Sequence, residues 1–181
     1  MRKVVLYQLL SLDGVAEEPG DWMFDGGREL FDNLAGIIER QDAILLGHGT
    51  YDYWAGYWPT SDVEPFASFV NGTTKHVFAS SPPAAEWANS VIVSEPVDGY
   101  VAELKRRPGA DIGVHGSIRL ARSLLRSDLV DELRLVMSPV LANNGGRRLF
   151  DGDDVLRRFD LLEVATSAAG TVFLAYSRST S

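Results

Sequence analysis

Residues 111–126, with the sequence DIGVHGSIRLARSLLR, constrain the fold more than any other stretch of this chain. A short apolar strand breaks at residues 115–117 and continues directly as an amphipathic helix. One face of that helix is apolar and is made by Leu120, Ala121, Leu124 and Leu125. A strand that leads straight into such a helix is typical of an α/β protein with a parallel sheet.

The junction between this strand and helix is a candidate anion site. Ser117 is placed to cap the helix, and Gly116 lets the backbone come close to a ligand. The first turn of a helix has free N–H groups and the positive end of the helix dipole, so a phosphate or pyrophosphate fits there. The same residues also fit a purely structural turn, because strand-Gly-Ser-helix junctions are common in α/β proteins.

The rest of the chain repeats the alternation of strand and helix. Apolar, β-favouring runs predict eight strands, at residues 3–10, 43–47, 75–79, 90–94, 111–115, 131–140, 159–167 and 171–179. Helical spacing predicts four helices, at residues 27–40, 63–70, 97–107 and 118–126. We therefore expect one α/β domain over residues 1–181, with a mostly parallel sheet and a C-terminal antiparallel hairpin.

Composition narrows the class of protein. A net charge of −8 disfavours nonspecific binding to nucleic acid. The absence of cysteine excludes disulfides, thiol catalysis and iron–sulfur clusters, and it fits a cytoplasmic protein. No apolar run is long enough to span a membrane. The three histidines lack the spacing of a metal site, so no metal is expected.

Ligands of open α/β sheets bind beyond the carboxyl ends of the strands. Four predicted strand ends have Gly, Ser or Thr where donors could reach phosphate or ribose, at residues 11–14, 47–51, 80–81 and 115–117. Each segment alone also fits a polar turn. Between the first strand and first helix, Trp22, Met23 and Phe24 need a packing partner, either the core or a ligand.

Several motifs occur along the chain in one order. They are SLDG at 11–14, LGHGTY at 46–51, GS at 116–117, LVDELRL at 129–135, SPVL at 138–141 and GRRLF at 146–150. Together they resemble the dihydrofolate reductase-like family, and within it the stand-alone relatives of the RibD C-terminal reductase domain. The resemblance covers nearly the whole chain.

The resemblance implies a dihydrofolate reductase-like fold, a homodimer, and transfer of a hydride from NADPH. The cofactor-binding residues that it implies are Gly47, His48, Gly49, Thr50, Tyr51, Ser80, Ser81, His115, Gly116, Ser117 and Ile118. Within this set, residues 47–51 and 116–117 match the pyrophosphate site, and residues 80–81 match the adenosine ribose site. Asp13 and Trp22 match the region where the nicotinamide meets its substrate.

Two departures from the family pattern bear on these expectations. The family has Arg, which helps to bind the 2′-phosphate of NADPH, where this chain has His48. Because a histidine cannot supply a guanidinium fork, NADH is also a possible cofactor, unless Lys75 or an arginine compensates. The loop at 139–146 also lacks the family's usual glycine pattern, which leaves its backbone path open.

A proton donor is hard to assign. The helical spacing turns Glu29 and Asp32 toward solvent, so neither replaces the carboxylate with which folate reductases protonate the pterin. Asp13 is the remaining candidate for catalysis, although an Asp before Gly also fits a plain turn. Trp54, Tyr57 and Trp58 could line a flat ligand site or pack in the core or a dimer interface.

These features favour an NAD(P)H-dependent reductase of a small pteridine- or pyrimidine-like heterocycle. The alternatives are a noncatalytic ligand-binding protein that keeps the reductase fold, or an assembly role for the aromatic surface at residues 51–58.

Overall fold

The computed structural model describes residues 1–24, 26–143, 145–151 and 155–179. Eight strands form one sheet in the order β4-β3-β2-β5-β1-β6-β8-β7. The strands are β1 Val4–Leu10, β2 Gln41–Gly47, β3 Thr74–Phe78, β4 Ser90–Val93, β5 Asp111–His115, β6 Glu132–Met137, β7 Phe159–Thr166 and β8 Val172–Arg178. β1 to β6 pair in parallel, whereas β8 is antiparallel to both β6 and β7. The mostly parallel sheet and its closing hairpin are as predicted.

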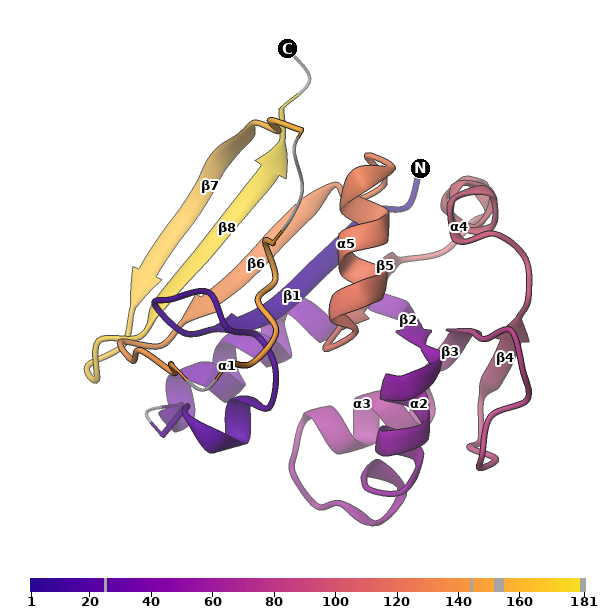
Figure 1. Cartoon of the computed structure of the whole chain (residues 1–181), viewed down its shortest axis with the longest axis horizontal. Coiled ribbons are helices and arrows are strands. Elements are labelled where there is room, and N and C mark those ends of the chain that lie inside the picture. The colour runs from indigo at the N-terminus through magenta and orange to yellow at the C-terminus, as the bar shows by residue number, and fades with distance from the viewer. Residues whose placement is uncertain (25, 144, 152–154, 180–181) are drawn as a thin grey trace.

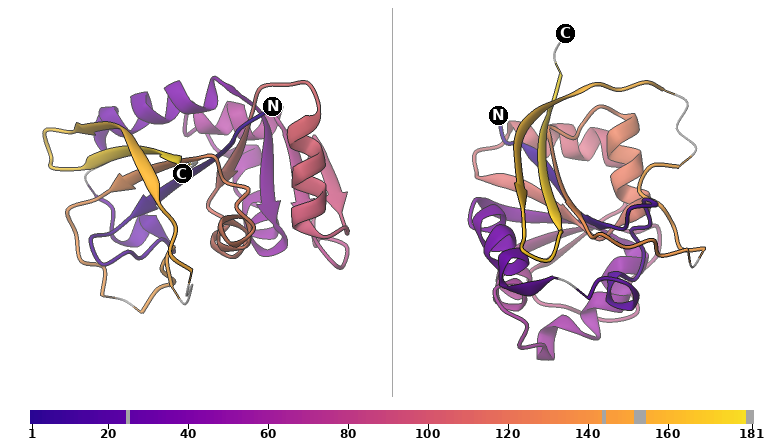
Figure 2. Two further views of the ribbon diagram at one scale, coloured as in Figure 1. Left: turned by 90° about the horizontal axis from the view of Figure 1, so that it is seen from above. Right: turned by 90° about the vertical axis from the view of Figure 1, so that its left-hand side faces the viewer.

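Helices cover both faces of this sheet (Figure 1). They are α1 Gly27–Ile38, α2 His48–Ala55, α3 Phe66–Gly72, α4 Val97–Arg106 and α5 Ile118–Arg126. α4 and α5 pack on one face, where Val101 and Leu124 join the largest apolar cluster. α1 and α3 pack on the other face. The views agree in placing the β7–β8 hairpin at one end of the sheet and β4 with α4 at the other (Figures 1 and 2).

The prediction of four helices was one too few. The described residues contain five α-helices, because residues 48–55 form α2 immediately after β2. The sequence HGTYDYWA hides this helix, since glycine and aromatic residues have modest helix propensity. Packing supplies what propensity lacks: Tyr51 is 1% exposed, and Trp54 packs against the same apolar cluster.

The predicted first helix is confirmed as α1, and its inner face is narrower than expected. Ile37 and Ile38 are buried and Leu34 is partly buried, but Phe31 is 39% exposed. Glu29 and Asp32 face solvent as predicted.

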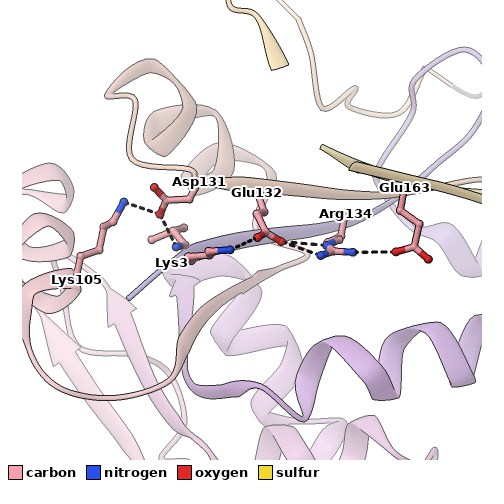
Figure 3. Close-up of polar contacts among 7 residues, drawn as sticks. Lys3, Lys105, Asp131, Glu132, Arg134 and Glu163 are labelled. Carbon is pink, nitrogen blue, oxygen red and sulfur yellow. Dashed lines mark hydrogen bonds and ion pairs between the residues drawn. The ribbon is translucent and has the colours of Figure 1, made fainter. Parts of the chain in front are cut away.

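Ion pairs hold the strands together at the amino-terminal end of β1 and β6 (Figure 3). The Glu132 carboxylate accepts hydrogen bonds from Lys3 Nζ at 2.6 Å and from Arg134 Nη2 at 2.8 Å. Arg134 also pairs with Glu163 of β7, over 3.7 Å. Beside these ion pairs, Lys105 Nζ of α4 donates a hydrogen bond to the Asp131 carboxylate at 2.6 Å. The network ties α4, β1, β6 and β7 together, which is a structural role.

Candidate functional site

The parallel pairing of β1, β2, β3 and β5 brings their carboxyl ends to one edge of the sheet. The segments 11–14, 47–51, 80–81 and 115–117 therefore share this edge, as the sequence predicts. A direct contact joins two of them: the Gly47 N–H donates to Ser117 Oγ over 3.0 Å. Because this bond fixes the end of β2 against the end of β5, the helices that follow both strands begin side by side.

The first turns of α2 and α5 are both electropositive. Neither first turn contains an acidic residue, and neither helix has a side-chain hydrogen bond at its N-cap. The sequence predicted Ser117 as the cap of α5, but its hydroxyl accepts from Gly47 instead. The positive ends of two helix dipoles therefore lie at the same edge with no carboxylate in either first turn to neutralise them. Such a site suits an anion.

Most predicted site residues are accessible at this edge. Gly49, Ser80, Ser81 and Gly116 are exposed, and Gly47, His48 and Thr50 are partly exposed. A side chain added at Gly49 would meet nothing within 4 Å, so the backbone at the start of α2 is open to a ligand.

His48 has a partner that sequence reasoning missed. His48 Nε2 lies 3.2 Å from Asp52 Oδ2, one helical turn further along α2. The second carboxylate oxygen, Asp52 Oδ1, accepts the N–H of Ala84 over 3.0 Å. Asp52 thereby links α2 to the segment that follows Ser80 and Ser81. The spacing of four residues between His48 and Asp52 was the available signal.

Besides Ser117, which is buried and bonded to Gly47, three predicted cofactor-binding residues have side chains in the core instead. Tyr51 is 1% exposed, His115 is 3% exposed and Ile118 is 5% exposed. Their side chains do not reach the edge, so any contact that they make with a cofactor is through the backbone.

Burial of the His115 imidazole has electrostatic consequences. The ring lies between aromatic residues of α3 and β1, and its Nε2 is 2.8 Å from Gln41 Oε1. Burial lowers the pKa of His115 to about 3, so the ring stays neutral at physiological pH. Gly113 makes room for this contact, because a Cβ there would collide with the Gln41 carboxamide.

Gly116 allows a close approach, as predicted, but the neighbour is a protein side chain. Its φ is +72°, and a Cβ at this position would lie 2.9 Å from Cζ2 of Trp54. Trp54 also packs edge-on against Trp58 and Phe66, with ring centroids 5.9 and 5.6 Å away. Of the alternatives for these tryptophans, the structure supports packing within the chain.

Asp13 connects two loops. Its carboxylate accepts hydrogen bonds from Ser11 Oγ at 2.7 Å and from the N–H groups of Ala142 and Asn143 at 2.9 and 3.2 Å. These bonds lower the pKa of Asp13 to about 2, and the hydrogen bond from Ser11 has the largest effect. A carboxylate held ionised in this way is unsuited to donate a proton, so the candidate catalytic role of Asp13 is not supported. Its bonds fix the backbone at residues 142 and 143, and the Leu12 N–H donates to the Val140 carbonyl, so part of the loop that the sequence left open is defined.

Trp22 lies in the interior and not on a face open to substrate. Its indole is 3% exposed, and its Nε1 donates to the Glu17 carbonyl over 2.9 Å. Of its two neighbours, Met23 packs against the core and Phe24 is 81% exposed. The proposed contact of Trp22 with a substrate therefore has no support in this geometry.

Lys75 cannot replace the missing arginine. It is fully buried at the start of β3, where its Nζ donates to the carbonyls of Val70 and Thr73 at 2.8 and 3.0 Å. The site lies at the opposite end of the same strand.

The described residues also bear on metal binding and on membrane insertion. Among residues 1–24, 26–143, 145–151 and 155–179, no three His, Asp or Glu side chains are grouped as metal ligands. No helix in that part of the chain is long and apolar enough to cross a membrane.

Comparison with known families agrees with this architecture. Residues 2–173 match the model of the RibD C-terminal domain. The chain belongs to the RibD C-terminal domain family. One protein of similar sequence is the uncharacterized protein YwjB of Bacillus subtilis (strain 168). It is 29% identical over 147 residues, which are 80% of each chain.

Solved structures show the same fold at lower identity. A protein from Shewanella sp. PV-4, described as one of riboflavin biosynthesis, has a TM-score of 0.80 at 17% identity, over 98% of this chain and 99% of that one. A pyrimidine reductase-like protein from Corynebacterium diphtheriae has a TM-score of 0.69 at 18% identity, over 99% of this chain and 93% of that one. Dihydrofolate reductase from Enterococcus faecalis, complexed with NADP(H) and RAB-propyl, has a TM-score of 0.64 at 13% identity, over 97% of this chain and 96% of that one. The fold of this RibD C-terminal domain is therefore dihydrofolate reductase-like.

Proposed function

We propose that this protein is an NAD(P)H-dependent reductase of a small heterocycle, with the pyrophosphate of the dinucleotide bound at the start of α2 and α5. One observation carries the proposal. The Gly47–Ser117 hydrogen bond of 3.0 Å sets two helix N-termini side by side, without acidic residues, at the ligand-binding edge of the sheet. Family membership and the likeness to a reductase complexed with NADP(H) support it.

The residues present fit such a cofactor. N–H groups in the first turns of α2 and α5 would bind the pyrophosphate, and Gly49 leaves space beside them. Ser80 and Ser81 are exposed and follow the neighbouring strand β3, where their hydroxyls would bind a ribose. Bound there, the dinucleotide would supply a hydride.

The protein's part in this chemistry is to position the reactants. The Asp13 bonds to residues 142 and 143 fix the loops after β1 and β6 against each other, beside the proposed nicotinamide end. The substrate proposed is a pyrimidine- or pteridine-like heterocycle, whose reduction needs one proton besides the hydride. Because Asp13 is held ionised, we assign that proton to solvent and most of the catalysis to alignment of cofactor and substrate.

Gly49→Glu tests the anion site. The new carboxylate would point into open space and favour the first turn of α2, yet it would repel a pyrophosphate. We expect the dissociation constant of the reduced dinucleotide, measured by quenching of tryptophan fluorescence, to rise about tenfold or more. Gly36→Glu is the matched control, because Gly36 also has an open Cβ position but lies on α1. Wild-type protein that binds neither NADPH nor NADH would refute the proposal.

The second candidate function is noncatalytic binding of the dinucleotide. It is favoured because Asp13 is held ionised, which leaves no side chain assigned as the proton donor. Oxidation of bound cofactor with a panel of pyrimidinones, pterins and quinones separates the two functions. Binding without oxidation of cofactor by any of these compounds would favour the noncatalytic protein.

The homodimer and the cytoplasmic location stay predictions. Sedimentation equilibrium tests whether the protein is a dimer. Lysine substitutions that would disrupt a dimer can be placed in edge strand β7, at the exposed apolar residues Leu161, Leu162 and Val164.

A further inference from the structure

We propose that the segment between β3 and α4, together with Asp52, makes the site selective for NADH over NADPH. The inference rests on the proposed function and identifies which of the two dinucleotides it uses. It concerns the part of the site around Ser80 and Ser81.

The position of the adenosine ribose follows from the sheet order. The pyrophosphate site lies between the ends of β2 and β5, and β3 is the next strand beyond β2. Because neighbouring strands are about 5 Å apart, a ribose attached to that pyrophosphate lies over the end of β3. Ser80 and Ser81 follow this strand directly and are exposed. On the other flank, β1 leads into the loop held by Asp13.

Asp52 is fixed beside this ribose position. Its Oδ1 accepts the Ala84 N–H at 3.0 Å and its Oδ2 lies 3.2 Å from His48 Nε2, so both oxygens are oriented. Its side chain remains about one-third exposed, 32%. A carboxylate at the edge of an α/β sheet is a natural acceptor for a ribose hydroxyl, and it repels a phosphate on the same carbon.

The fixed charges of the segment between β3 and α4 have the same sign as Asp52. Residues 76–104 contain no lysine or arginine, whereas Glu95 and Asp98 follow β4 at this same edge. The nearest lysine in sequence, Lys75, is buried at the far end of β3. A 2′-phosphate would add roughly two negative charges next to these carboxylates.

The arginines of this edge lie on the other flank. Arg147 Nε donates to Glu17 at 2.7 Å, and Arg148 Nε donates to the Asp13 carbonyl at 2.7 Å. Arg119, in the first turn of α5, acts on the Glu17 carboxylate. Arg147 and Arg148 are therefore held at the loop after β1, away from the β3 side where a 2′-phosphate would need them.

The test compares dissociation constants of NADH and NADPH for the wild-type protein, from tryptophan fluorescence at low ionic strength. We expect NADH to bind about tenfold more tightly, and added salt to reduce the difference. Binding of 5′-AMP against 2′,5′-ADP repeats the comparison for the adenosine end alone. Asp52→Asn keeps an acceptor for the Ala84 N–H while removing the charge, so it should tighten NADPH and reduce the preference. Asp62→Asn, at an exposed acid outside the segment, should leave it unchanged.

The outcomes separate this inference from the proposed function. NADPH binding as tight as NADH binding, or tighter, would overturn the selectivity and leave the reductase proposal intact. A preference for NADH that Asp52→Asn does not alter would overturn the role of Asp52. Binding of neither dinucleotide would overturn both proposals.

Discussion

Replacing Lys75 with methionine should change how stability depends on pH. Lys75 is 0% exposed, and its ammonium group donates to the carbonyls of Val70 and Thr73 and lies 4.5 Å from the centroid of the Trp87 ring. Within the part of the chain that the structure describes, no carboxylate pairs with it. Burial lowers the pKa of Lys75 from 10.5 to about 8.

The sign follows from proton linkage. Below about pH 8 the Lys75 amine is charged in both the folded and unfolded states, so the cost of burying the charge is present in full. Between about pH 8 and 10.5 the folded state releases its proton first, and the stability of the wild type rises. One pKa unit corresponds to about 1.4 kcal/mol, so the full effect is about 3 kcal/mol. The two carbonyls and the Trp87 ring favour the charged form, so we expect about 2 kcal/mol between pH 7 and 10.

The assay is urea unfolding of the wild type and Lys75→Met at pH 7 and pH 10, followed by tryptophan fluorescence. The measured quantity is the difference in free energy of unfolding between the two proteins at each pH. Lys3→Met is the control, because a hydrogen bond to Glu132 raises the pKa of Lys3 and keeps it charged at both pH values. An equal difference between wild type and Lys75→Met at pH 7 and pH 10 would refute the reasoning.

Three further predictions concern the site and its supports. Gly116→Ala should cost about 1–2 kcal/mol in thermal unfolding, since its φ is +72° and a Cβ would crowd Trp54, whereas Gly36→Ala should cost nothing. The wild type should lose about 3 kcal/mol from pH 7 to pH 4 as the unfolded state protonates His115, and His115→Gln should flatten this loss in urea titrations. Asp13 stabilises the fold above its unfolded pKa of 3.8, and this contribution is lost as pH falls toward 2. Asp13→Asn should therefore lower the melting temperature at pH 7 more than at pH 2, measured by circular dichroism.

The sheet could be predicted from sequence because its central strands are buried on both faces. β1 reads VVLYQLL and six of its seven residues are buried, so the apolar run is unmistakable. β7 is different, since almost all of it is exposed at the edge of the sheet, and it was found through the Ala-Ala-Gly turn that joins it to β8. Pairing in parallel then fixed which loops share an edge.

The side-chain roles could not be predicted, because they depend on partners far away in sequence. Asp13 meets the backbone of residues 142 and 143, about 130 positions later. The hydrogen bond between Gly47 and Ser117 joins residues that are 70 positions apart in the sequence. Lys75 is an ordinary basic residue in sequence, and only the fold places it in the interior. Local sequence patterns predict where a strand ends, but they do not predict which side chains and backbone groups pack against that end.

Residues 115–117 show how this limits the choice of experiments. The His115 ring is in the core, Gly116 supports Trp54, and the Ser117 hydroxyl is bonded to Gly47. What remains for an anion at this end is the backbone of the first turn of α5, which substitution of a side chain does not remove. Loss of binding in a variant of residues 115–117 would therefore report disrupted packing as readily as a lost ligand contact. A charge added at Gly49, where an added side chain meets nothing, tests the ligand site without that ambiguity.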